Sequence, residues 1–334
     1  MTAYEAGVVH RRAFHPQIRP FGGTSGPFPS PSRHAEAVTE PLLRRSALAA
    51  GHTDAELRRA VRRGELQRLT PGVYLDADGV QLLDDVGRHR LLARTVGTGL
   101  RPAAAISHIS AAVLHEFDVW QTDLALIHTT NGRSAGGRRG PTRYVHAAVL
   151  GGDVVQLDGV RVTSPARTVV DLARTLPVEE AVVVGDSALR RYPDLDFRAH
   201  FDAPRAGIAA ARRVVGFLDA RSESPGESLS RLRLRDAGLP VPVLQRTIHT
   251  PSGVFVARVD FFWEQWGLVG EFDGMVKYGT VDDVRAEKHR EDALRDLGLQ
   301  VVRWTWPELF RFDVVVERLR RAVHRSRSAP SHPL

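Results

Sequence analysis

The stretch that most constrains the fold is Phe255–Lys277, which reads FVARVDFFWEQWGLVGEFDGMVK. It predicts two apolar strands joined by a short connection. Asp260 lies in the first strand, Glu271 closes the second, and Asp273 follows two residues later. Alternate side chains of a strand share one face, so Glu271 and Asp273 are expected to point the same way. A hairpin of this length can bring the carboxylates of Asp260 and Glu271 together at one sheet edge.

Two interpretations of these acids stay open. Carboxylate oxygens are the ligands that Mg²⁺ or Mn²⁺ prefers, and acids that interrupt apolar strands are costly to bury unless they are paired or metal-bound. An Asp at a strand end, however, is often only a turn or cap residue. A metal site is therefore a hypothesis that the rest of the chain has to support.

Size and charge bound the possible partners. The chain has 334 residues, enough for two or three domains, and its apolar content of 43% suffices for a sizeable core. Lys and Arg number 46 against 39 Asp and Glu, and the pI is near 10.4. Such a balance suits a polyanion, most often nucleic acid, although an Arg-rich coding bias would produce the same balance.

The lack of cysteine excludes several chemistries, namely disulfides, thiolate catalysis, iron–sulfur clusters and Cys-type zinc sites. It also fits a reducing cytoplasm. No apolar run approaches the roughly 20 residues that span a bilayer, and the N-terminus lacks a secretory apolar region. We therefore expect a cytoplasmic protein that does not engage a membrane.

Both ends of the chain look unstructured. Residues 1–38 contain a Gly pair and several prolines among small polar residues, with no sustained periodicity. This pattern predicts a disordered leader, or a misassigned start of the chain. Residues 326–334 are expected to form a disordered tail.

Residues 39–79 predict helix, turn, helix and hairpin, the order of a winged helix-turn-helix. The segment LLRRSALAA is expected to form the first helix. A capping box, Thr53-Asp54-Ala55-Glu56, opens the second helix, and Gly64 ends it. Two short strands then flank the turn Thr70-Pro71-Gly72.

Arginines cover the expected outer face of the second helix and continue onto the wing. A recognition helix enters the major groove, where Arg side chains reach guanine edges or phosphates. A solvated charged surface is the alternative, but this many arginines on one short helix with a wing behind it favour DNA contact. The candidate DNA-binding residues are Arg58, Arg59, Arg62, Arg63 and Arg68.

The segment AGHTDAELRRAVRRGELQRLTPGVYL resembles the N-terminal domain of the AbiEi family, the antitoxins of type IV toxin–antitoxin abortive-infection systems. In that family the winged helix binds DNA upstream of its operon and represses it. The resemblance, which covers about forty residues, thus implies DNA as a partner and adds a cognate toxin as a possible second one.

Residues 80–220 predict a middle α/β module. A helix is expected over Val80–Leu100, and strands follow, with a Gly- and Arg-rich loop between two of them. His108 and His115 lie seven residues apart without a full ligand set, so we do not expect a metal site there. The segments ISHISAAVLHEF and SPARTVVDLAR look like the corresponding region of AbiEi-type proteins from actinobacteria. In the second segment Arg167 and Asp171 lie four residues apart on a helix and are expected to pair.

Residues 221–325 predict the order helix, three strands, helix, strand, helix. With acids on the second and third strands, this order is similar to the PD-(D/E)XK nuclease core. The segments SPGESLSRLRLRDAGLP, VARVDFFW, LVGEFDG and HREDALRDLGLQVVRWTW resemble short-patch-repair-endonuclease-like domains of that superfamily. The resemblance covers roughly 110 residues and is carried by the combination of the segments.

The resemblance assigns roles to individual residues. Asp260 matches the first metal-ligating acid, and Glu271 matches the acid of the E-x-K element. Glu227 matches a helix glutamate that completes the metal site, although an acid at this place also suits the helix dipole. Asp273 stands where the superfamily has Lys, and Lys277 is the nearest substitute, with Lys288 as another. The implied cofactor is Mg²⁺ or Mn²⁺.

These observations predict a multidomain α/β (α+β) protein with two leading functions. The first is a DNA-binding protein with a Mg²⁺-dependent endonuclease-like domain that hydrolyses phosphodiesters in phage defence, toxin–antitoxin regulation or DNA maintenance. The alternative is an AbiEi-like antitoxin and transcriptional repressor whose nuclease fold is catalytically inactive. A third possibility is an adaptor whose basic surfaces bind RNA or a partner protein. The sequence does not predict an oligomeric state.

Overall fold

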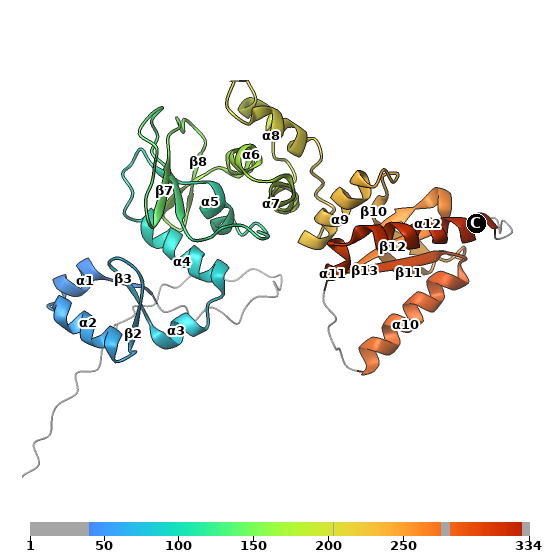
Figure 1. Ribbon diagram of the computed structural model, residues 1–334, viewed down its shortest axis with the longest axis horizontal. Helices are drawn as coiled ribbons and strands as arrows, with labels where there is room; N and C mark the ends of the chain where they lie inside the picture. Colours follow the sequence, from blue (N-terminus) through green and yellow to red (C-terminus); the bar gives the residue numbers. More distant parts are fainter. Residues whose placement is uncertain (1–39, 203, 275–280, 329–334) are drawn as a thin grey trace, which may run out of the picture. The chain divides into compact units, whose positions relative to one another are not determined.

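The expected α/β fold is confirmed in a computed structural model, which describes residues 40–202, 204–274 and 281–328 (Figure 1). This part of the chain contains three β-sheets, each accompanied by helices. The expected leader over residues 1–38 and the candidate Lys277 lie outside the described residues.

The first sheet has three strands in the order β1-β3-β2. Thr53 and Glu56 form the expected capping box, with Thr53 N–H donating to the Glu56 carboxylate over 2.8 Å. Gly64 follows the second helix with φ +70°, as a C′ glycine should. The first helix is shorter than expected, because Leu42 and Leu43 pair with the hairpin instead. The elements are β1 (Leu42–Leu43), α1 (Arg44–Ala49), α2 (Asp54–Arg62), β2 (Leu66–Thr70) and β3 (Val73–Asp76).

The second sheet has six strands in the order β6-β7-β5-β4-β9-β8. Its strands are β4 (Ala105–Ile106), β5 (Ile127–Thr130), β6 (Arg138–Arg139), β7 (Arg143–His146), β8 (Val154–Leu157) and β9 (Val160–Thr163).

Helices precede, interrupt and follow the strands of this second sheet along the chain. The prediction of a single helix over Val80–Leu100 is wrong. The segment contains parts of two helices, because the Asp84 side chain accepts a hydrogen bond from Gly87 N–H over 2.7 Å and caps the start of the second one. The helices are α3 (Ala77–Gln81), α4 (Asp85–Gly97), α5 (His108–Leu114), α6 (Pro165–Thr175), α7 (Val178–Arg191) and α8 (Ile208–Val215), with a 3₁₀ turn, η1 (Arg198–His200).

The third sheet has four strands in sequence order, the first three antiparallel and the last pair parallel. The parallel pair requires a crossover, which α10 provides. A separate short helix precedes the last one, since Thr305 and Glu308 form a capping box that starts it. The elements are α9 (Pro225–Asp236), β10 (Val243–His249), β11 (Phe255–Trp263), η2 (Glu264–Trp266), β12 (Leu268–Asp273), α10 (Val281–Asp296), β13 (Gln300–Thr305), α11 (Trp306–Leu309) and α12 (Phe312–Ser328).

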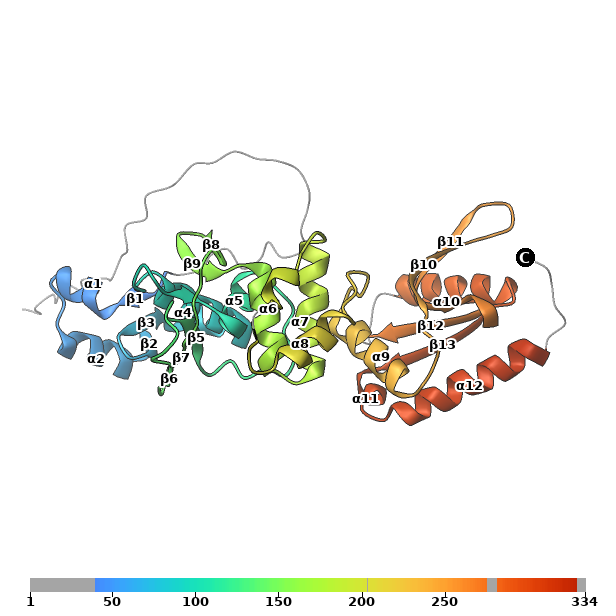
Figure 2. The same ribbon diagram turned by 90° about the horizontal axis from the view of Figure 1, so that it is seen from above.

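This sheet separates two apolar cores, with α10 on one side and α12 on the other (Figure 2). Leu294 of α10 packs with Val259 and Val269 in one core. The other core contains Trp304 of β13 and Val315 of α12, and it continues into α6 and α7. The α12 helix runs to Ser328, three residues into the segment expected to be a tail. Within the described residues, no helix combines the length and apolarity needed to cross a membrane.

Gly226 gives a test of this packing, because a Cβ there would lie 1.9 Å from Cε1 of Phe272 on β12. Ala would favour the helix by propensity, but overpacking of this kind costs about 1–3 kcal/mol. We expect Gly226→Ala to lower the free energy of unfolding in urea. Gly152→Ala is the control, since nothing lies within 4 Å of its added Cβ. Equal stability of the two variants would contradict the packing described here.

Candidate functional site

Two acids expected from the sequence, Glu227 and Asp260, are joined by a glutamine. Glu227 lies in the first turn of α9, where its Oε1 accepts from the Ser224 hydroxyl over 2.8 Å. Asp260 lies on β11. Gln245 of β10 donates from Nε2 to Glu227 Oε2 over 2.9 Å and to Asp260 Oδ1 over 3.4 Å. One amide therefore holds two carboxylates beside each other.

The environment of Asp260 favours its protonated form. Burial, followed by the nearby charges of Glu227 and Glu271, raises the pKa of Asp260 to about 7. The Phe272 N–H donates to Asp260 Oδ2 over 2.9 Å, and this hydrogen bond lowers the pKa of Asp260 by a smaller amount. Asp260 can thus gain or release a proton near neutral pH, a property that often marks functional sites.

Glu271 is buried on β12 but has a different environment. The strand pair Phe261 and Gly270 sets the register between β11 and β12, so Asp260 and Glu271 come next along that register. The Glu271 carboxylate forms a bidentate pair with Arg290, at 2.8 and 2.9 Å, and its Oε2 lies 3.0 Å from Nε of Arg303. Two guanidinium groups therefore balance the charge of this acid.

The remaining sequence candidates lie farther out. Asp273 follows Glu271 by two residues at the exposed end of β12. Lys288 of α10 is exposed. The structure thus brings Glu227, Asp260 and Glu271 to one region and leaves Asp273 at its solvent edge.

Gln245 was not identified from the sequence. Its backbone φ of +53° falls in a region that non-glycine residues rarely adopt, and such strain collects at functional sites. Leu244 and Arg246 pair with Phe261 and Val259, which leaves Gln245 facing Asp260. No local pattern in β10 signals this conformation, because φ is set by the neighbouring strands and acids.

The donor set fits a hard cation in part. Glu227 and Asp260 offer carboxylate oxygens, the ligands of Mg²⁺ and Mn²⁺, whereas Gln245 presents its amide nitrogen to them and would have to turn to offer its oxygen. A cation would also relieve the repulsion that raises the pKa of Asp260. Glu271 fits less well, because it already pairs with Arg290 and Arg303. A cation that used Glu271 would have to compete with these two arginines.

The arginines expected to bind DNA are all exposed, and they lie on α2, at its C-cap and on β2. Leu57 and Ala60 face the small core, so the helix turns its charged side outward. Arg63 is paired with Glu65 at 2.7 Å. The five residues, which the sequence predicted to lie on the outer face of the helix and on the wing, are Arg58, Arg59, Arg62, Arg63 and Arg68.

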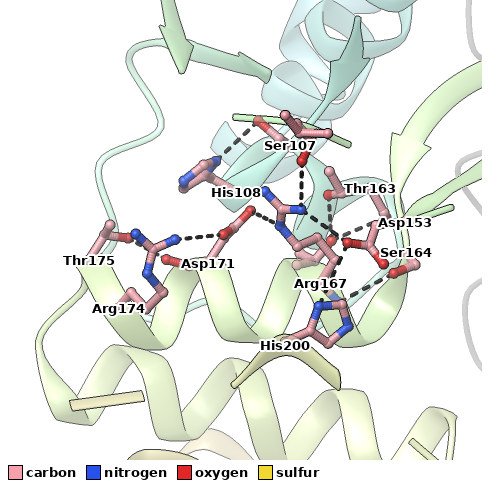
Figure 3. Close-up of polar contacts among 12 residues, drawn as sticks. Ser107, His108, Asp153, Thr163, Ser164, Arg167, Asp171, Arg174, Thr175 and His200 are labelled. Carbon is pink, nitrogen blue, oxygen red and sulfur yellow. Dashed lines mark hydrogen bonds and ion pairs between the residues drawn. The ribbon is translucent and has the colours of Figure 1, made fainter. Parts of the chain in front are cut away.

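A second polar centre lies in the module of the six-stranded sheet (Figure 3). The expected pair of Arg167 and Asp171 is confirmed at 2.8 Å, and Arg174 adds a bond of 3.1 Å to the same carboxylate. The His115 ring bonds to the Thr163 carbonyl oxygen. His108 instead meets His128 and His146, a grouping that the sequence analysis missed because it depends on strand pairing.

Asp260 predicts a pH dependence of stability. Its pKa is 3.8 ordinarily and about 7 when folded, so the folded protein keeps a proton that the unfolded chain has lost. The free energy of unfolding should therefore fall as pH rises from about 4 to about 7, by at most about 1.4 kcal/mol per pH unit. Urea unfolding of wild type and Asp260→Asn should diverge across this window, in favour of the variant.

Glu227→Gln is the matched control for that measurement. It removes the neighbouring charge that ranks second, after burial, in raising the pKa of Asp260. In a Glu227→Gln background, the difference in free energy of unfolding between the Asp260→Asn variant and its parent should stop growing at a lower pH. A constant difference at every pH would show that Asp260 does not titrate as described.

The chain is similar to two Mycobacterium tuberculosis proteins, and no family model matches it. They are named uncharacterized protein MT2308, of strain CDC 1551, and uncharacterized protein Rv2248, of strain ATCC 25618. The identity to each is 34% over 248 residues, which cover 72% of this chain and 86% of the relative. The chain therefore belongs to the same family as these mycobacterial proteins.

Proposed function

We propose that this is a DNA-binding protein with a nuclease-like C-terminal domain of the PD-(D/E)XK kind. The observation that carries the proposal is the contact of Glu227 and Asp260 through Gln245, with Glu271 next along the strand register. The order of α9 to α12 around a sheet with one parallel pair supports it.

The proposed reaction is hydrolysis of a phosphodiester bond. A bound Mg²⁺ or Mn²⁺ would supply a water of lowered pKa and charge stabilisation at the phosphate. Glu227, Asp260 and Glu271 would hold the cation. Gln245 fixes the orientation of Asp260, and Asp260 can exchange a proton near neutral pH. Arg290 bonds to the Glu271 carboxylate and would hold the DNA backbone.

A second function is favoured by a specific observation at the same site. Glu271 is paired with Arg290 and Arg303, and Asp273 stands where a nuclease of this kind would have Lys. A site neutralised in this way suits a fold that binds DNA without cutting it. The protein would then act as an AbiEi-like repressor, with a cognate toxin as its partner.

Both functions assign DNA binding to the exposed arginines of α2 and β2. The helix–turn–helix order of α1 and α2, with the β2–β3 hairpin after them, supports a winged helix. The cation-dependent reaction separates the two functions, because only the first requires it.

Substitution of the acids tests the nuclease. Asp260→Ala and Glu271→Ala should each lower Mg²⁺-dependent nicking of plasmid DNA by at least about 100-fold, the usual contribution of a group that handles protons or charge. Glu264→Ala is the control, because this exposed acid lies between β11 and β12. Calorimetry with Mg²⁺ should show binding by wild type and Glu264→Ala and a loss of binding in the other two variants. If wild type neither binds Mg²⁺ nor nicks DNA, yet binds operator DNA, the repressor is the correct function.

Salt dependence tests the winged helix. Arg58→Gln and Arg62→Gln should weaken DNA binding, and each lost phosphate contact should reduce the slope of log K against log salt by about 0.9. Arg198→Gln removes the same charge from an exposed arginine of η1 and serves as the control. Fluorescence anisotropy at several salt concentrations gives the slopes. Equal slopes for wild type and all three variants would exclude this surface as the DNA contact.

A further inference from the structure

Three histidine rings converge in the module of the six-stranded sheet. His108 begins α5, whereas His128 and His146 lie on the parallel strands β5 and β7. One nitrogen of each ring lies within 4.8 Å of the others. His146 Nε2 is 3.1 Å from His128 Nδ1, and the rings of His108 and His146 stack with centroids 3.6 Å apart.

The backbone explains why these rings meet. The Ser107 N–H donates to the His128 carbonyl oxygen over 3.0 Å, so the start of α5 is fixed against β5. In the register of β5 and β7, Thr130 pairs with His146, which places His128 and His146 on one face. His108 completes the group with φ +51°, a strained backbone conformation for a non-glycine residue.

Burial disfavours the charged form of all three rings. Burial lowers the pKa of His108 well below its ordinary value, and burial lowers the pKa of both His128 and His146 to about 4. Neutral imidazole is the form that binds metals, so no proton has to be removed first.

Charged groups surround the rings and leave one donor unused. Beside the larger effect of burial, the charge of Asp171 raises the pKa of His146 and the charge of Arg167 lowers the pKa of His108. Arg167 is buried and bonds to Asp171 and Asp153, but its Nη2 has no hydrogen-bond partner among the described residues (Figure 3). The unpaired Nη2 can bond to a water or an anion but cannot itself bind a metal.

We propose that His108, His128 and His146 bind a divalent transition-metal ion of the class that prefers imidazole, such as Zn²⁺. Three protein ligands leave a fourth position open, as in zinc sites that bind a substrate or water. Binding requires the stacked rings of His108 and His146 to turn, and the contact between His128 and His146 to open, so that one nitrogen of each ring lies about 2.1 Å from the metal. This site differs from the carboxylate site in the third sheet, whose oxygen ligands select hard cations.

Cobalt titration tests the proposal on the full-length chain. Co²⁺ replaces Zn²⁺ and gives visible absorption that reports its coordination. The titration is done in an Asp260→Asn, Glu271→Gln background, so that the carboxylate site does not contribute. We expect one Co²⁺ per chain with four-coordinate absorption, and a loss of affinity of more than about 100-fold in His128→Asn and in His146→Asn, since even outer-shell losses cost 10- to 100-fold.

His115→Gln is the matched control, because His115 is also buried in this module but its ring hydrogen-bonds only to the Thr163 carbonyl oxygen among the described residues. It should bind Co²⁺ like the parent protein. Absence of binding in the parent, or binding that survives both His128→Asn and His146→Asn, would overturn the proposal. If the variants do not fold, X-ray absorption of the zinc-loaded parent decides, since three imidazole ligands support the site and any other ligand set refutes it.

Discussion

The buried carboxylate of Asp186 is the interaction on which the placement of the candidate acid site depends. Asp186 lies on α7, and its charge is costly to bury without partners. Burial raises its pKa, whereas Arg231, the Asp219 N–H and the Ser228 hydroxyl oppose that rise. Arg231 and Ser228 belong to α9, and their bonds to Asp186 measure 2.7 and 2.8 Å. The same helix carries Glu227 in its first turn, so the position of Glu227 is set through Asp186.

The cost of burying a charge also explains why Glu271 and Asp260, two acids of the sheet, differ in their partners. Glu271 has two arginine partners and behaves as half of a buried ion pair. Asp260 bonds to a glutamine and a backbone N–H but to no cationic side chain among the described residues, so burial and the neighbouring acids keep its pKa near 7. Two carboxylates on neighbouring strands thereby have different environments, one favouring a bound proton and the other a paired charge.

Local signals predicted much of this fold, whereas the site depended on contacts that local signals do not carry. The capping box at Thr53 and the strands that hold Asp260 and Glu271 were evident from residue patterns. The break before α4 was missed because a continuous apolar pattern hid the cap at Asp84. Gln245 was missed because its backbone conformation is imposed by tertiary packing, which overrides local propensity.

The histidine group shows the same limit in a different form. His108, His128 and His146 are separated by about twenty residues each, and only the parallel pairing of β5 with β7 brings the last two together. A spacing rule for metal ligands applies to residues on one element or one loop. It therefore led to His108 and His115, which lie at opposite ends of α5 and face different partners. Fold and family membership likewise leave the activity open, since activity resides in the geometry of such groups.

Under the proposed function, Arg290 has two alternative counter-ions, the Glu271 carboxylate and a DNA phosphate. Any cation that competes for Glu271 then favours phosphate binding by Arg290, and by linkage DNA must favour the cation equally.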